Sequence, residues 1–468
     1  MYNFVMPAED WDETNPNKQA ILHLILKHRR EAERLNKLER YYKGEHDILN
    51  DTDRENKLVC NHAKDISDTA SSYFIGNPVS YKSEEDITVI TDELENAGAD
   101  EADGDNGLDL SIYGRAYEYI YTQKDETELR IKNLPPQNTF VVIDNSIEEN
   151  ELFAVYYWEK KDDTDQITTK YVATILTENF KYVLNILDKD EYQSVTEQPE
   201  PHYKGKVPVI EYRNNKLGIG DFELQIPLID AYNVLMSDRV TDKEQFIDAI
   251  LMVYGTLLGD PQEDEKENNH EDDNPMKRLH KEKMMEMPAD SRAEYLTRTF
   301  DESGVEILKK AIEQDIHKFS HIPCMSDESF GGNVSGVAME FKLLGMENIT
   351  KVKSRYYKKG LRKRIRIFAN FLQMRSCTMV DATAITPVFT RALPKNLLEI
   401  SQYVANLWGK VSKRTLLAQI PFVDNVDEEV QAVEKEEQES IEKQQKLFGN
   451  NVNELPDLED DDKEVDDE

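Results

Sequence analysis

The sequence has few cysteines and no long apolar run. Its three cysteines, Cys60, Cys324 and Cys377, are far apart in a chain of 468 residues. An odd, scattered set forms no disulfide framework and indicates a reducing compartment. No apolar stretch approaches the roughly 18 residues that a membrane-spanning helix needs, and the first residues lack a secretory-signal pattern. We therefore expect a soluble protein made in a cytoplasm.

Positive charge is also scarce. The 57 lysines and arginines face 93 acidic residues, which gives a formal net charge of −36. Such a chain does not wrap DNA passively on a basic surface. A negative wall repels a phosphate backbone, however, and would suit a passage through which DNA must slide without being held.

One segment departs from this balance. Residues 351–366 contain nine lysines and arginines and no acidic residue. As a DNA-binding face, the segment would contact phosphates and bind with salt-dependent affinity. As an interface, it would pair with the acidic surface of a neighbouring copy. We favour the interface, because a protein of this charge must offset its own repulsion when it packs against itself.

The signatures of nucleotide binding and catalysis are missing. Gly331 and Gly336 have the spacing of a phosphate-binding loop, but Val337 and Ala338 occupy the places of its lysine and hydroxyl residue. No nucleophile elbow or zinc-protease motif is present either. We interpret the glycine-rich stretch as a flexible connector between two helices, and we expect no enzymatic activity and no cofactor.

Metal sites are equally poorly supported. His317, His321 and Cys324 have a ligand-like spacing, but no second Cys/His pair completes a zinc site. We expect ordinary surface or interface histidines at a helix end. Residues 99–109 resemble a calcium loop in composition, but the glycine and glutamate positions do not fit, so a solvated turn between helices is predicted. Clustered acids would suit a two-metal nuclease, yet no spacing selects a set.

The first half of the chain predicts an α+β unit. Helical periodicity covers 18–42 and 57–76, a short strand follows at 78–83, and two further helices flank an acidic turn within 87–122. The predicted apolar stripe of the first helix comprises Ile21, Leu24, Ile25, His28, Ala32, Leu35 and Leu38. Runs typical of strands occupy 116–123, 128–134, 138–144, 152–160, 170–177 and 180–187.

The second half is mainly helical. Long helices are predicted at 227–248, 304–321 and 336–375, with a small mixed module between the first two and a strand at 249–255. The third helix carries one apolar stripe, Leu361, Ile365, Phe368 and Leu372, and Gly345 or Gly360 would permit it to bend. A strand and one or two helices follow, before an acidic end.

Several segments, in order, resemble the portal proteins of tailed phages, of the siphophage type from Gram-positive hosts. The segments are 111–121, 227–238, 295–323, 325–348, 358–366 and 385–396. The most specific is the D-x-x-F-x-G-N-x-S-G-V-A run at 327–338.

The resemblance implies a multi-domain α+β fold of wing, stem, clip and crown, assembled as a ring around a central channel. The implied parts are a wing (1–223), stem helix 1 (224–248), clip (249–301), stem helix 2 (302–322), tunnel loop (323–335), long wing helix (336–376), crown (377–453) and disordered acidic tail (454–468).

Two sets of site residues follow. The tunnel loop, whose glycines would let it change shape as DNA passes, comprises Ser326, Asp327, Glu328, Ser329, Phe330, Gly331, Gly332, Asn333 and Ser335. The basic helix, interpreted as a subunit interface, contributes Lys351, Lys353, Arg355, Lys358, Lys359, Arg362, Lys363, Arg364 and Arg366.

The implied function is a DNA conduit at one capsid vertex, for genome packaging, retention and ejection. The implied partners are further copies of the chain in a dodecamer, double-stranded DNA without sequence specificity, terminase, head-completion or adaptor proteins, scaffold and major capsid proteins, and no membrane. The protein would be part of the virion after assembly in the host bacterial cytoplasm. The alternatives are a metal-dependent nuclease or an acidic head scaffold or adaptor.

Overall fold

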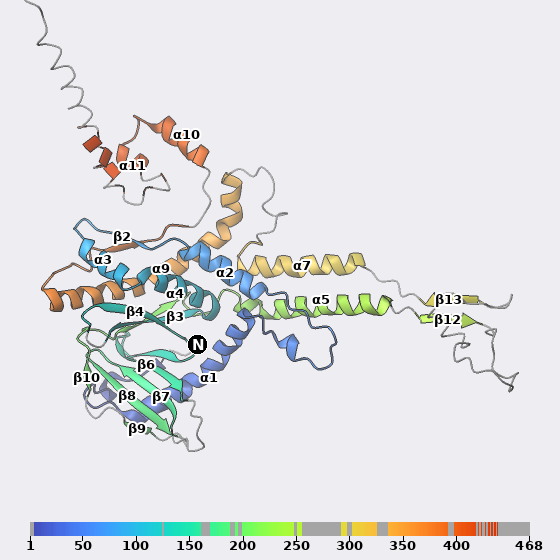
Figure 1. Ribbon diagram of the computed structural model, residues 1–468, viewed down its shortest axis with the longest axis horizontal. Helices are drawn as coiled ribbons and strands as arrows, with labels where there is room; N and C mark the ends of the chain where they lie inside the picture. Colours follow the sequence, from blue (N-terminus) through green and yellow to red (C-terminus); the bar gives the residue numbers. More distant parts are fainter. Residues whose placement is uncertain are drawn as a thin grey trace, which may run out of the picture. The chain divides into compact units, whose positions relative to one another are not determined.

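The computed structural model describes most of the chain. The described residues are 4–123, 126–160, 169–187, 192–194, 199–247, 250–254, 292–296, 302–324, 336–391, 397–417 and scattered positions from 420 to 438. They belong to two compact units: unit 1 comprises Met1–Asn333 with Met339–Ala392, and unit 2 comprises Val334–Ala338 with Leu393–Glu468. Helices and strands are mixed, which confirms the predicted α+β class (Figure 1).

The N-terminal part of unit 1 is mainly helical. Its elements are β1 (Phe4–Val5), η1 (Ala8–Asp10), α1 (Lys18–Tyr42), η2 (Asp47–Asn50), α2 (His62–Ile75), β2 (Ser80–Lys82), α3 (Thr88–Asn96) and α4 (Ala99–Tyr113), where η denotes a 3₁₀ helix. The predicted apolar stripe of α1 is buried in full. The helix begins where the side chain of Asn17 accepts a hydrogen bond from the amide of Ala20 at 3.1 Å.

Residues 99–109 form part of a helix, so the predicted turn is wrong. Gly98 (φ 75°) and Gly114 (φ 78°) flank α4 in left-handed conformations that favour glycine. Inside the helix, Gly107 lets α2 approach closely, because a Cβ there would lie 2.4 Å from Cγ2 of Ile75. Asp103 is buried in the same helix. The glycine and aspartate residues that suggested a solvated turn have other roles: Gly107 permits close helix packing, and Asp103 is a buried charge.

Two antiparallel-rich sheets follow, and each predicted strand run is confirmed. The larger sheet has the order β1-β5-β6-β7-β8-β10, with β9 also on β8, and only β1 pairs in parallel. Its later strands are β5 (Thr139–Ile143), β6 (Glu151–Glu159), β7 (Thr169–Leu176), β8 (Phe180–Leu187), β9 (Tyr192–Ser194) and β10 (Glu200–Pro201). The smaller sheet orders β11 (Val209–Arg213), β3 (Arg115–Thr122) and β4 (Leu129–Leu134).

The remaining elements of unit 1 include three long helices. They are η3 (Glu223–Gln225), α5 (Ile226–Ile247), β12 (Ile250–Tyr254), β13 (Arg292–Leu296), α7 (Glu302–Ser320), α9 (Gly336–Ser376), which begins in unit 2, and β14 (Thr386–Val388). The helices match the predicted ones to within a few residues. Further strands considered within 276–288 lie outside the described residues.

Clusters of buried apolar side chains hold unit 1 together, and two of them pack against its long helices. One lies between α1 and the larger sheet, where Ile21 and Ile25 pack with Phe140 and Val155. The other surrounds α9, whose predicted stripe of Leu361, Ile365, Phe368 and Leu372 is fully buried beside residues of α2 and the smaller sheet. The second half of α9 therefore packs one apolar face into the interior of unit 1.

Gly360 has a different role from the predicted bend. A Cβ at this position would lie 2.3 Å from Cε1 of Tyr212, so glycine is needed for the contact between α9 and β11. Gly345 has only ordinary contacts, the nearest at 3.6 Å. Close packing therefore explains one of the two glycines.

The boundary expected at 377 also changes. Strand β14 pairs antiparallel with β2, and unit 1 continues to Ala392. Unit 2 contains α10 (Leu397–Leu407) and α11 (Lys413–Leu417), which confirms the helices predicted there. The tail at 454–468 lies outside the described residues. All three cysteines are free.

Candidate functional site

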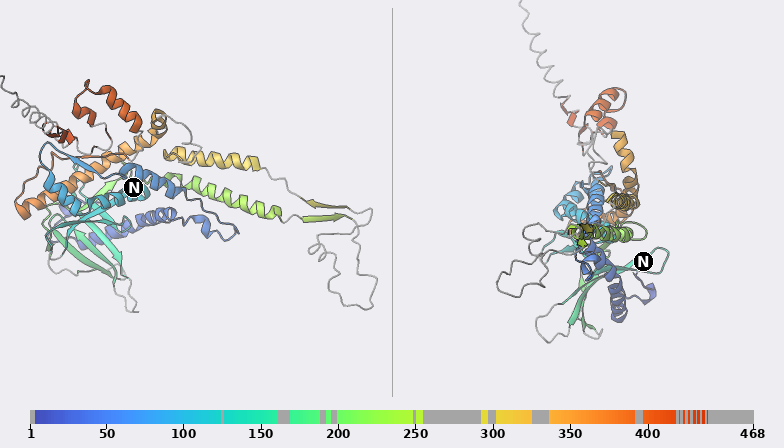
Figure 2. Two further views of the ribbon diagram at one scale, coloured as in Figure 1. Left: turned by 45° about the horizontal axis from the view of Figure 1, so that its top comes forward. Right: turned by 90° about the vertical axis from the view of Figure 1, so that its right-hand side faces the viewer.

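Helices α5 and α7 lie side by side and connect to the strand pair β12–β13 (Figures 1 and 2). Arg239 of α5 donates a hydrogen bond to Glu306 of α7 at 3.0 Å and also pairs with Glu302. Lys243 lies 2.8 Å from the other oxygen of Glu302, and these two cations lower the pKa of Glu302. Because these ion pairs are partly exposed to water, each contributes little to stability.

The first half of α5 is bound firmly to the segment between α1 and α2. Asn233 is fully buried, and its Oδ1 accepts from the amide of Cys60 at 2.8 Å while its Nδ2 donates to His46 at 2.8 Å. One turn later, the hydroxyl of Ser237 accepts from the amide of Leu58 at 2.9 Å. Such buried side-chain to backbone bonds hold the root of the helix pair to the body of unit 1.

The end of α7 lies directly before the glycine-rich stretch. Nδ1 of His317 is 3.0 Å from the carbonyl of Ile322, and the side chain of His317 is buried, so it is not a surface histidine. The centroids of the His317 and His62 rings are 5.6 Å apart. His321 has a left-handed backbone (φ 59°). Within the described residues, no group of three or more His, Cys, Asp or Glu is placed to hold a metal ion.

The predicted tunnel-loop residues lie outside the described residues. The structure describes both flanks, α7 before the loop and α9 after it. The role of Ser326, Asp327, Glu328, Ser329, Phe330, Gly331, Gly332, Asn333 and Ser335 remains a proposal.

The basic segment of α9 is divided between the interior and the surface. Arg364 is fully buried, where Nε donates to Glu118 at 2.8 Å and Nη2 donates to Asp103 at 2.6 Å. Although burial opposes it, the two carboxylates raise the pKa of Arg364. Lys353, also buried, donates to Asp221 at 2.7 Å. An interface role for Lys353 and Arg364 is therefore wrong.

A third member of the segment is also used within the chain. Nζ of Lys363 donates to the carbonyl of Val209 at 2.7 Å and pairs with Glu151. Burial lowers the pKa of this amine. Lys353, Lys363 and Arg364 together attach α9 to the rest of unit 1.

The outer face of the same helix carries a cationic stripe. Arg355, Lys359, Arg362 and Arg366 are exposed, and their spacing of four, three and four residues puts them on one side of the helix. None of them forms a salt bridge with another residue of the described chain. Lys351 pairs with Glu347, and Lys358 lies over the ring of Phe389. The stripe is thus the part of the basic segment that is free to meet a partner.

Helices α7 and α9 also carry exposed apolar side chains outside the stripe. On α7, Ile307 is 70% and Phe319 56% exposed, and on α9 Phe341 is 72% exposed. Association with another protein would remove these side chains from water.

Comparison with known proteins gives a consistent family. A model of the family described as "Phage portal protein, SPP1 Gp6-like" matches residues 21–443. The chain belongs to the SPP1 Gp6-like family of phage portal proteins. The portal protein of Bacillus phage SPP1 is 24% identical and aligned over 96% of this chain and 92% of that protein. The portal protein of Clostridium phage phiCD119 is 22% identical, and the alignment covers 80% of this chain and 83% of that protein.

Family membership confirms the resemblance and the portal function predicted from sequence. This portal protein therefore belongs with structural components of the phage capsid. In the described part of the chain, no helix combines the length and apolar character that crossing a bilayer requires.

Proposed function

We propose that this portal protein assembles as a closed ring, expected to be a dodecamer, through which double-stranded DNA enters and leaves the capsid. Family membership carries the proposal, and the paired helices α5 and α7 support it because they match the two stem helices expected of a subunit. Helices α5 and α7 form the stem, 249–301 the clip that docks terminase and head-completion proteins, and 323–335 the tunnel loop. The chain carries out no catalysis.

The cationic stripe supplies part of the contact between subunits in this proposal. Arg355, Lys359, Arg362 and Arg366 lie exposed on a chain of net charge −36, so the surface of a second copy offers them many carboxylates. The exposed apolar residues of α7 and α9 would be covered by the same association.

Assembly is tested by negative-stain electron microscopy of the purified protein with mass from light scattering. We expect rings with a hole of roughly 20 Å or more, wide enough for B-form DNA. A closed dimer without a channel, together with Mg²⁺-dependent or Mn²⁺-dependent plasmid cleavage, would instead support the nuclease alternative. If only monomers appear, addition of scaffold and capsid proteins tests whether the ring needs them to nucleate.

The role of the stripe is tested by charge reversal. Arg355→Glu with Arg362→Glu should reduce ring formation, because the changes remove cations from the exposed face alone. Lys132→Glu with Lys216→Glu is the matched control, since both lysines are exposed and the net charge change is the same. Equal assembly by the two double variants would remove the stripe from the interface. Arg364 must be left intact, because reversing the charge of this buried residue would disturb folding and not the interface alone.

The loop is tested by deletion. Shortening 326–333 should leave rings intact and block DNA packaging or retention, since the proposed loop contacts DNA in the channel. Normal packaging by intact rings of this variant would contradict the assignment.

A further inference from the structure

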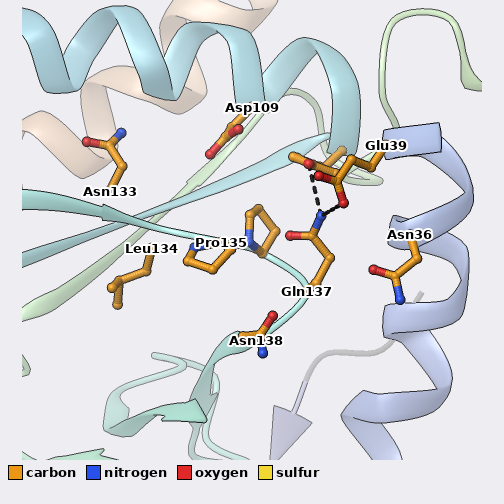
Figure 3. A pocket seen from close by; sticks show the side chains of 10 residues that line it. Asn36, Glu39, Asp109, Asn133, Leu134, Pro135, Gln137 and Asn138 are labelled. Atoms are coloured by element: carbon orange, nitrogen blue, oxygen red, sulfur yellow. Dashed lines mark hydrogen bonds between the residues drawn. The ribbon is translucent and has the colours of Figure 1, made fainter. Parts of the chain in front are cut away.

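A polar cavity lies between α1, α4 and the segment that joins β4 to β5 (Figure 3). Its volume is about 460 Å³, and it is lined among others by Asn36, Glu39, Asp109, Tyr113, Pro135 and Gln137. This is the size of a pocket for a small organic molecule. The lining combines two carboxylates and several amides with the apolar faces of prolines.

Two polar groups in the cavity lack partners. The carboxylate of Asp109 makes no hydrogen bond or ion pair with any described residue, and Figure 3 shows it extending from α4 towards Pro135. Gln137 is only 9% exposed, and its Oε1 is buried without a hydrogen-bond partner. An unpartnered buried oxygen costs about 1–3 kcal/mol, so Oε1 of Gln137 favours a donor that the chain does not supply. Asp109 is half-buried, and its carboxylate adds an acidic group to the wall of the cavity.

Glu39 and the amide nitrogen of Gln137 already have hydrogen-bond partners in the chain. Glu39 accepts from Lys43 at 2.6 Å and from Nε2 of Gln137 at 3.0 Å. The same Nε2 lies 2.9 Å from the hydroxyl of Tyr113. The hydrogen bond to Glu39 therefore fixes the orientation of the Gln137 amide. In this orientation Nε2 is hydrogen-bonded and Oε1 has no partner.

We propose that this cavity binds a small organic cation, an alkylammonium compound whose ammonium group pairs with Asp109. An ammonium supplies donors and the positive charge that the carboxylates lack, while its methylene chain can lie on the prolines. A metal ion fits less well, since no set of three or more acidic or His/Cys ligands occurs in the described part of the chain. The inference goes beyond the proposed channel and does not depend on ring formation.

Binding should release a proton. Burial, with Asp105 and Glu39 nearby, raises the pKa of Asp109 to about 8. The charged groups that face it are Asp105 on its own helix and Glu39 on α1, with Lys43 engaged by Glu39. The 133–138 segment carries no charge. Below this pKa the empty site holds a neutral acid, so affinity for an ammonium should increase as the pH rises towards about 8.

The test is calorimetric titration of the full-length protein with 1,4-diaminobutane, at about 0.15 M salt to suppress loose surface binding. We expect saturable binding of one molecule per chain, tighter at pH 8 than at pH 6. Asp109→Asn should weaken it by at least about tenfold. Asp100→Asn, which removes an exposed carboxylate of the same helix outside the cavity, should leave it unchanged.

Three results would overturn the proposal. They are no saturable heat, equal binding by the Asp109→Asn protein, and an equal loss in the Asp100→Asn protein, which would show binding to surface charge only. Titration with MgCl₂ separates the ligand classes, since an Asp109-dependent Mg²⁺ heat of the same size would make the site a metal site. None of these results bears on whether rings form, which microscopy measures independently.

Discussion

Arg364 balances the charge of two buried carboxylates inside unit 1. It is fully buried beside Asp103 and Glu118, whose side chains are 3% and 0% exposed. In an Arg364→Met protein the two carboxylates would stay buried without a cation. Breaking a buried ion pair by removing one partner costs about 3–5 kcal/mol. Since a factor of ten corresponds to about 1.4 kcal/mol, the unfolded population should rise by roughly 10²-fold to 4 × 10³-fold.

The assay is urea denaturation followed by tryptophan fluorescence and circular dichroism. Arg362→Met is the control, an exposed arginine on the same helix, and should change the free energy of unfolding by less than about 0.5 kcal/mol. A protein that also carries Asp103→Asn and Glu118→Gln should regain most of the loss, because no charge then remains buried in this cluster. The argument is refuted if Arg364→Met is no less stable than Arg362→Met, or if removing the two carboxylates restores nothing.

Three further predictions concern packing and burial. Gly107→Ala should lower the free energy of unfolding by about 1–3 kcal/mol, because its Cβ overlaps α2. Gly104→Ala, whose Cβ meets nothing within 4 Å, should raise the free energy of unfolding by about 0.5–1 kcal/mol. Urea midpoints that rank the two variants the other way would contradict the close approach of α2 and α4. Gly360→Ala should cost about 1–3 kcal/mol because its Cβ overlaps Tyr212, and an unchanged midpoint would show that the ring can move aside. Burial lowers the pKa of Lys204 to about 8, so the unfolded chain holds this proton more tightly than the folded chain does. The charged amine therefore destabilises the folded protein below pH 8, and this destabilisation fades as the pH rises towards 10.5. Lys204→Met should therefore stabilise the protein by up to about 3 kcal/mol at pH 7, and thermal melts in which the gain does not shrink at alkaline pH would oppose this cause.

Local periodicity predicted much of this fold. The apolar spacing in 18–42 gave the bounds of α1, and alternation gave the strands of both sheets, because burial of one face imposes the pattern on the sequence. The helix over residues 99–109 was wrongly predicted as a turn, because local preference alone was considered there. Gly107 and Asp103 suit a turn by local preference, and only their contacts with α2 and α9 make them suitable for a helix.

The buried cations of α9 could not be placed from residue type alone. Lysine and arginine are rarely buried, so the whole basic segment was assigned to the surface. A signal was nevertheless present in the spacing. Lys353 and Arg364 share one helical face with the apolar Tyr357, Leu361 and Phe368, whereas the four cations of the exposed stripe lie elsewhere on the helix. A cation that falls within an apolar stripe predicts a buried carboxylate opposite it.

The buried ion pairs of Lys353 and Arg364 also limit how far α9 can follow a movement of the loop before it. Lys353 and Arg364 are eleven residues apart, or about 16 Å along a helix, and each is paired with carboxylates on other elements of unit 1. A helix held at two points of one face can neither slide nor rotate without breaking both buried pairs. If the loop at 323–335 changes shape as proposed, only the first turns of α9 can follow it, and the helix beyond Lys353 stays with unit 1.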